Sequence, residues 1–194
     1  MRGITVFTTL LVISFLNLFA LSGTLAANIR SEPFHFLRKN KGGRFFSANA
    51  AVTMADGSIK RIADIKAGEH VQTCKGGKSM TTEVKHVDIY DKPASALTAV
   101  YLKPAGRNKD HQTMVPAILL EAAPQHFVQT RHGKKRMRKL SKNDILYRYE
   151  PLTGVVSSWK VGAVHENARK VSKAYNLETA DGTFLVGNVV IANN

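Results

Sequence analysis

The stretch FSANAAVTMADGSIKRIADIKAGEHVQT, residues 46–73, decides the fold class. Short runs of apolar and β-branched residues alternate here with turn signals, and no 3.6-residue period is sustained. Residues 55–58 (ADGS) contain an Asp-Gly pair, which is the strongest short-range sequence signal for a β-hairpin. The stretch therefore predicts strands rather than helices, at residues 50–54 and 69–73.

The same pattern continues to the end of the chain. A second Asp-Gly signal stands at residues 180–183 (ADGT), and Trp159 and Val161 alternate as core-facing positions of one strand. The pattern predicts an all-β fold, with further strands at residues 80–90, 98–102, 117–121, 127–130, 145–149, 155–165, 174–178, 183–186 and 189–192.

An internal repeat underlies these strands. RIADIKAGEHVQT, from Arg61, aligns with RMRKLSKNDILYR, from Arg136, and after a two-residue insertion GKSMTTEVKHV aligns with GVVSSWKVGAV. Gly and Asn, the residues that best tolerate a left-handed turn, share one aligned position. Copies of about 75 residues are too small for separate cores, so we expect two interlocked β subunits related by a pseudo-two-fold axis. The main aligned pairs are Ile65 with Leu140, Gly68 with Asn143, Glu69 with Asp144, Val71 with Leu146, Val84 with Val161 and Val87 with Val164.

The N-terminal residues have the order of a secretory signal. A basic start (Met1-Arg2) precedes an uncharged apolar run at residues 4–21, and small residues follow at 22–27. We predict cleavage near Ala26 or Ala27, a secreted chain, a short leader at 28–44 and one domain at 45–194. The alternative is a membrane anchor formed by residues 4–21.

Composition limits the chemistry that the chain can perform. Cys74 is the only cysteine, so no internal disulfide can form, and its turn-like context TCKGGK favours an incidental thiol. The seven histidines lack metal-ligand spacing, and no phosphate loop, dinucleotide fingerprint or Gly-x-Ser-x-Gly element is present. We therefore expect no metal, no cofactor and a monomer.

The net charge is +14, and much of it is local: residues 131–139 (RHGKKRMRK) contain six Lys or Arg. The simplest interpretation is a solvated loop that keeps the protein soluble. The alternative is a surface for an acidic polymer or a membrane. The run lacks the interleaved aromatic residues that would indicate nucleic-acid binding. The basic residues of this run are Arg131, Lys134, Lys135, Arg136, Arg138 and Lys139.

Three blocks of the sequence carry a family resemblance. Residues 46–73 look like the opening block of Hint domains, the fold shared by Hedgehog C-terminal autoprocessing regions, inteins and bacterial intein-like proteins. LLEAAPQHFVQT, residues 119–130, resembles their middle block, which contains Thr-x-x-His. YNLETADGTFLVGNVVIANN, residues 175–194, resembles their closing block, which usually ends in His-Asn.

The resemblance implies a self-cleavage chemistry whose key positions are changed here. In the family the first residue is Cys or Ser and attacks the preceding carbonyl, but this position holds Phe45. The middle-block His corresponds to His126, while Ala123 replaces the assisting Thr. The terminal Asn corresponds to Asn193, while Ala192 replaces the assisting His.

We therefore expect a secreted Hint-fold protein that has lost self-cleavage, with His126 and Asn193 as vestiges of the site. One alternative is an active domain that uses Ser47, shifted by two residues, to release the leader. The other is a basic secreted module that binds an acidic partner.

Overall fold

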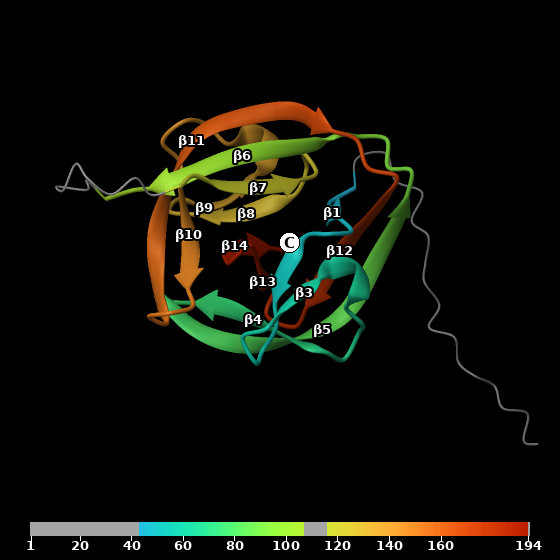
Figure 1. The fold of residues 1–194 in the computed structure, drawn as a ribbon, viewed down its shortest axis with the longest axis horizontal. Coiled ribbons are helices and arrows are strands. Elements are labelled where there is room, and N and C mark those ends of the chain that lie inside the picture. The colour runs from blue at the N-terminus through green and yellow to red at the C-terminus, as the bar shows by residue number, and fades with distance from the viewer. Residues whose placement is uncertain (1–42, 107–115, 194) are drawn as a thin grey trace, which may run out of the picture. The chain divides into compact units, whose positions relative to one another are not determined.

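The computed structural model describes residues 43–106 and 116–193, and these form an all-β domain (Figure 1). The predicted signal segment, leader residues 28–42 and Asn194 lie outside the described residues. The elements are β1 (Phe46–Ser47), β2 (Ala51–Thr53), β3 (Ile59–Arg61), η1 (Ile62–Asp64), β4 (His70–Lys75), β5 (Lys78–Asp91), β6 (Leu97–Pro104), β7 (Ile118–Ala122), β8 (Phe127–Thr130), β9 (Gly133–Arg136), η2 (Met137–Lys139), β10 (Ile145–Glu150), β11 (Val155–Arg169), β12 (Lys173–Thr179), β13 (Thr183–Val186) and β14 (Val189–Ala192).

Two sheets enclose the core. One is four-stranded, in the order β1-β12-β5-β4. The other is ten-stranded, in the order β3-β2-β13-β14-β8-β10-β11-β6-β7, with β9 paired to β8. The long strands β5 and β11 curl around opposite sides of the domain, so that the sheets wrap the core like two half-barrels (Figure 1).

Every strand predicted from periodicity is present, but three short strands were missed: β1, β3 and β9. The basic run is not a solvated loop, because its residues form β9 and η2. The physical reason is the turn before β9. Gly133 has a φ of 96°, and Thr130 Oγ1 donates a hydrogen bond to the Gly133 carbonyl oxygen (2.6 Å), which folds β9 back onto β8.

The two Asp-Gly signals have different outcomes. Residues 55–58 join β2 to its antiparallel neighbour β3, as predicted for a hairpin. Residues 180–182 also turn, with Gly182 at a φ of 70°, but β12 pairs in the four-stranded sheet and β13 in the other. The second prediction of a hairpin is therefore wrong, because this turn carries the chain from one sheet to the other.

The internal repeat is visible in matched side-chain contacts. Lys60 Nζ lies 2.6 Å from Glu69 Oε1 in the first copy, and Lys135 Nζ lies 2.7 Å from Asp144 Oδ2 in the second. Each carboxylate also accepts a hydrogen bond from the backbone N–H three residues earlier, at 2.9 and 2.7 Å. The two copies thus repeat one local structure, as the alignment predicts.

The core consists of a large cluster and a small one. Trp159 and Val161 are buried in the large cluster, as their alternation predicts. The small cluster lies where the chain enters the domain and contains Phe45, Tyr90, Leu97, Ala123 and Ala174. In the described part of the chain, no helix has the length and apolar character that spanning a membrane requires.

Candidate functional site

The Arg44–Phe45 bond enters the domain at the edge of the four-stranded sheet. Strand β1 follows at once and pairs with β12, placing Phe46 opposite Tyr175. The Phe45 carbonyl oxygen accepts a hydrogen bond from the Ala123 N–H (2.8 Å). This bond joins the opening block to the middle block, as expected for a shared site.

Glycine at position 43 allows the chain to reach this point. A Cβ atom on Gly43 would lie 2.8 Å from Cε1 of Tyr90, closer than side-chain carbons approach one another. Gly43 is itself buried. The segment that leads to the junction therefore lies directly against the Tyr90 ring, with no room for a side chain.

Phe45 stands at the position where we expected a nucleophile, and its side chain is entirely hydrocarbon. Its side chain is 1% exposed, and its ring centroid lies 5.5 Å from that of Tyr90. Burying a Phe side chain contributes about 1.5–3 kcal/mol to stability. Phe45 is thus a packing residue, and it offers no atom that could attack the Arg44 carbonyl.

His126 is buried beside β1. Its ring centroid lies 4.4 Å from that of Phe46, Nδ1 lies 3.0 Å from the Phe127 carbonyl oxygen, and Nε2 lies 3.1 Å from Asn176 Oδ1. Burial lowers the pKa of His126 to about 4. The imidazole is therefore neutral at pH 7, and its single N–H can donate either to the Phe127 carbonyl oxygen or to Asn176 Oδ1, but not to both.

Asn176 and Asp88 extend this hydrogen bonding toward the surface. The two residues are direct cross-strand partners on β12 and β5, and Asn176 Nδ2 donates to Asp88 Oδ2 (3.4 Å). Asp88 Oδ1 lies 3.5 Å from Nε2 of the half-buried His86. Sequence reasoning missed this contribution to the site, although an Asn and an Asp within otherwise apolar strand segments were a usable signal.

Asn193 lies at the same entrance as Arg44. The Arg44 Nη1 atom donates to the Asn193 carbonyl oxygen (2.8 Å). In the amide orientation that satisfies both ends, Asn193 Oδ1 accepts from the Thr179 backbone N–H (2.6 Å) and Nδ2 donates to the Leu177 carbonyl oxygen (3.0 Å). The side-chain nitrogen that would attack its own carbonyl is thus held by another acceptor.

The two positions predicted to have lost helper residues carry buried methyl groups. Ala123 packs with Phe45, and its carbonyl oxygen accepts a hydrogen bond from the backbone N–H of His126 (2.9 Å). Ala192 is buried on β14 opposite Phe127. The structure therefore brings Phe45, Ala123 and His126 together, and the Arg44 hydrogen bond connects Asn193 to the same junction.

Ser47 is the residue that the active alternative would use as its nucleophile. It lies opposite Ala174 on β1, next to Phe46. Successive side chains of a strand point to opposite faces, so the hydroxyl of Ser47 points away from the face on which Phe46 contacts His126.

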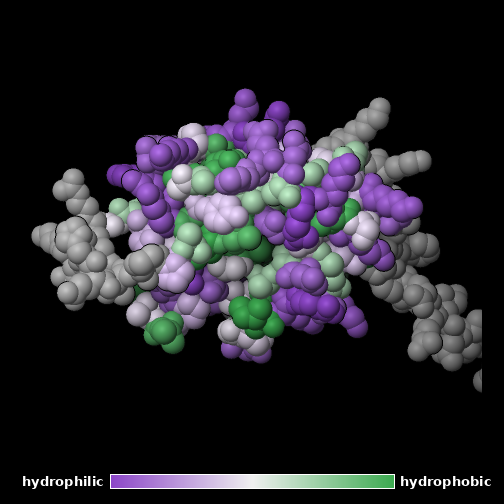
Figure 2. Space-filling model, turned by 45° about the horizontal axis from the view of Figure 1, so that its top comes forward, coloured by the Kyte–Doolittle hydropathy of each residue, from purple (hydrophilic) through white to green (hydrophobic). Residues whose placement is uncertain are grey.

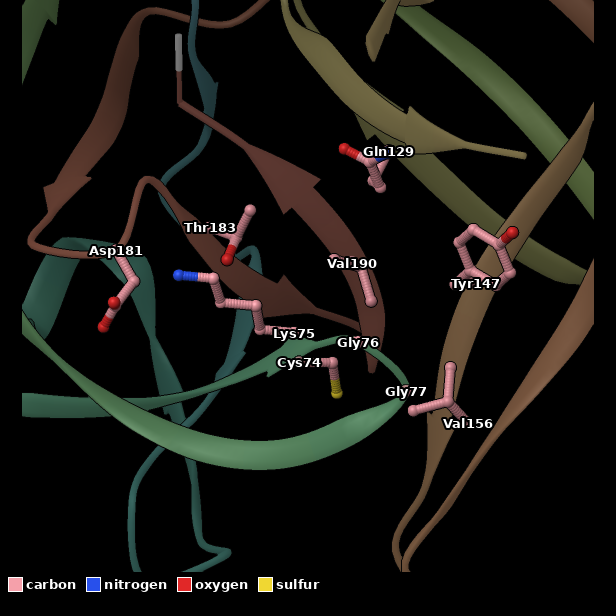
Figure 3. A pocket seen from close by; sticks show the side chains of 10 residues that line it. All are labelled: Cys74, Lys75, Gly76, Gly77, Gln129, Tyr147, Val156, Asp181, Thr183 and Val190. Atoms are coloured by element: carbon pink, nitrogen blue, oxygen red, sulfur yellow. The ribbon is translucent and has the colours of Figure 1, made fainter. Parts of the chain in front are cut away.

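Cys74 is one of ten residues that line a cavity (Figure 3). The cavity has a volume of about 520 Å³, and burial raises the pKa of the Cys74 thiol to about 11. Cys74 is therefore a protonated, weakly reactive thiol at neutral pH. The cavity is lined by Cys74, Lys75, Gly76, Gly77, Gln129, Tyr147, Val156, Asp181, Thr183 and Val190, and it includes none of the junction residues.

One residue of the basic run, Arg136, lies close to the junction. The Arg136 guanidinium carbon lies 5.3 Å from the centroid of the Phe127 ring, and that of Arg44 lies 5.1 Å from the same centroid. Both contacts are cation–π interactions with one ring. Lys135, by contrast, points to Asp144.

Comparisons with known proteins identify the fold. No protein-family model and no curated protein sequence matches the chain. A DnaB intein from Synechocystis sp. PCC 6803 matches with a TM-score of 0.59 at 16% identity, covering 78% of this chain and 99% of the intein. An intein from a hyperthermophile gives a TM-score of 0.62 at 13% identity, with 77% and 99% covered.

A third structure extends the comparison beyond inteins. The bacterial intein-like domain from Clostridium thermocellum matches with a TM-score of 0.52 at 19% identity, covering 77% of this chain and 98% of that domain. The described residues therefore adopt the Hint-type fold, as the three sequence blocks predict. At these identities the likeness concerns the fold, and the chemistry depends on the residues of this chain.

Proposed function

We propose that this protein is a secreted Hint-fold domain that no longer cleaves its own chain and keeps its leader attached. The observation that carries this proposal is the buried phenyl ring of Phe45 at the junction. An acyl shift requires a side-chain sulfur or oxygen to attack the Arg44 carbonyl carbon, while the bond to the Phe45 nitrogen breaks. Phe45 supplies no such atom.

The neighbouring residues support the same conclusion. Ala123 offers only backbone groups to Phe45, and Ala192 has a buried methyl group where an imidazole would assist Asn193. Burial holds the pKa of His126 near 4, so its imidazole is uncharged at neutral pH. It therefore has no imidazolium proton to donate. A nucleophile at position 45 alone should therefore restore only part of the activity.

Secretion is the second part of the proposal. It is supported by the order of basic start, apolar run and small residues at 1–27. A domain with one cysteine gains no disulfide in an oxidising compartment, so its stability there depends on the two core clusters. A protein recovered with residues 1–27 intact in a membrane fraction would contradict this part.

The decisive experiment compares the wild type with Phe45→Cys and Phe45→Ala. Intact mass and N-terminal sequence are measured on protein secreted by expressing cells and again after refolding of the purified chain with a thiol present. We expect a wild type that begins near Asn28 and remains whole. Phe45→Ala is the matched control, because it removes the ring but adds no nucleophile.

The outcomes separate the alternatives. Cleavage of Phe45→Cys between residues 44 and 45, greater still in Phe45→Cys with Ala123→Thr, would show a scaffold that lacks only its reacting groups. A wild type that cuts itself after purification would overturn the proposal. If that cut fell between Phe46 and Ser47 and disappeared in Ser47→Ala, the active alternative would be correct.

A further inference from the structure

We infer that exposed basic side chains on β9, η2 and the turns before and after them form a binding surface for a sulfated polysaccharide. We call this surface the basic face, and its proposed role is additional to the loss of self-cleavage. It consists of Arg131, Lys134, Arg136, Arg138, Lys139 and Lys142, all of which are exposed.

The basic face lacks counter-charges of its own. Residues 131–144 contain seven Lys or Arg and one acidic residue, Asp144, which pairs with Lys135. None of the six residues of the basic face has a carboxylate partner among the described residues. Some basic side chains elsewhere pair with carboxylates, as Lys60, Arg61, Lys85, Arg148 and Arg169 do; what distinguishes the basic face is the number of unpaired charges within one short segment. Uncompensated charge concentrated on one surface attracts polyanions.

The backbone beneath these charges is fixed. Lys134 and Arg136 are alternate residues of β9, so their side chains leave the same side of the strand about 6.7 Å apart. Met137 is fully buried and anchors η2, and the Arg138 N–H donates to the Pro124 carbonyl oxygen (3.0 Å). A fixed array of charges loses less conformational freedom on binding than a flexible loop does.

Protection of a sheet edge explains only part of this arrangement. Strand β9 pairs with β8 alone, and lysines on an edge strand discourage pairing with another chain. That role fits Lys134. Arg138, Lys139 and Lys142 follow the strand, so they add charge where there is no edge to protect.

The surroundings of the basic face favour a polysaccharide over other polyanions. The nearby ring of Phe127 is partly buried and already contacts the guanidinium groups of Arg44 and Arg136, so it is not free to stack on a nucleic-acid base. The large exposed apolar side chains of the described residues all lie outside 131–144, which leaves no apolar anchor for a bilayer. The face drawn in Figure 2 carries hydrophilic side chains with smaller hydrophobic areas between them. The secretion proposed above would expose this face to extracellular sulfated polymers.

The test uses the full secreted chain and a heparin-derived oligosaccharide, with the chemically desulfated oligosaccharide as a second probe. The variant changes Lys134, Arg138, Lys139 and Lys142 to Gln and leaves Arg136 on the Phe127 ring. The matched control changes Lys66, Lys75, Lys78 and Lys170 to Gln, which removes the same charge from exposed sites elsewhere. Affinity is measured by calorimetry at 50 and 200 mM NaCl.

We expect wild-type binding to weaken on the order of a hundredfold between these salt concentrations if about four charges are engaged. The variant should bind about tenfold or more weakly than the control at low salt, and the desulfated probe should not bind. No binding by the wild type, or equal losses in variant and control, would overturn the inference. Tighter binding to a DNA oligonucleotide of equal charge would overturn the choice of polysaccharide.

Discussion

Gly68 and Asn143 adopt the same left-handed backbone conformation, with φ angles of 88° and 83°. Each also donates its backbone N–H to the long strand of its own copy: Gly68 to the Val84 carbonyl oxygen (2.8 Å) and Asn143 to that of Val161 (3.0 Å). The repeat is therefore retained at the level of single hydrogen bonds, although the side chains differ.

This relationship predicts opposite effects for two substitutions at position 143. Asn143→Gly should keep or slightly raise the free energy of unfolding, because glycine adopts a positive φ without strain. Asn143→Val should lower it by about 1–2 kcal/mol, because a β-branched residue is strained in this conformation. Urea denaturation of both variants measures the difference. Equal midpoints would show that the turn does not constrain the residue.

Gly43→Ala should destabilise the junction. The added methyl group would meet Cε1 of Tyr90 at 2.8 Å, and overpacking of this kind costs about 1–3 kcal/mol. Tyr90→Leu in the same chain should relieve the clash, so the two losses should be less than additive in a double-mutant cycle. Additive losses would mean that the leader does not lie against Tyr90 in solution.

Stability should fall with acid through His126. Its pKa is about 4 in the folded state against an ordinary value of 6.5, so below 6.5 the unfolded chain binds a proton that the folded chain excludes. The stabilising contribution is complete above pH 6.5 and is lost as the pH falls from 6.5 to 4, by about 3 kcal/mol in total. Urea titrations across this range should show the slope. His126→Gln should flatten it, and an unchanged slope in this variant would assign the effect to another group.

Asn176→Leu should cost more than its change in volume suggests. The substitution removes one of the two oxygen acceptors within reach of the His126 ring nitrogens and leaves the buried Asp88 carboxylate without one of its donors. Unsatisfied buried polar groups cost about 1–3 kcal/mol each. Lys173→Leu, at an exposed position of the same strand, is the control and should change stability little. Equal thermal stability of the two variants would contradict the hydrogen-bonded arrangement.

The strands and the repeat were predictable because they depend on local periodicity. Strands β5 and β11 are long enough to show alternation, whereas β1 has two residues and cannot. Strand β9 was missed for another reason: its residues are Gly, Lys and Arg, and it is held by pairing with β8 rather than by apolar alternation. Local turn chemistry at Gly182 predicted the turn, but the sheet that each flanking strand joins depends on distant partners.

The candidate site was predictable only in part. The blocks located Phe45, Ala123, His126 and Asn193, and the structure connects them through main-chain and side-chain hydrogen bonds. The contact between His126 and Asn176 joins residues 50 positions apart. Their proximity depends on how β12 packs in the folded domain, which no local pattern encodes.

The hydrogen bond between Arg44 and Asn193 also defines how the domain can be combined with other sequences. The residues at which the chain enters and leaves the domain, Arg44 and Asn193, lie side by side. The domain can therefore be inserted into a surface loop of another protein without separating the two ends of that loop. For the same reason, a short linker could fuse the two attachment points and allow new termini to be opened at an exposed turn such as that at Gly76 and Gly77. A circularly permuted chain of this kind would keep every strand pairing while moving the leader away from the Tyr90 ring.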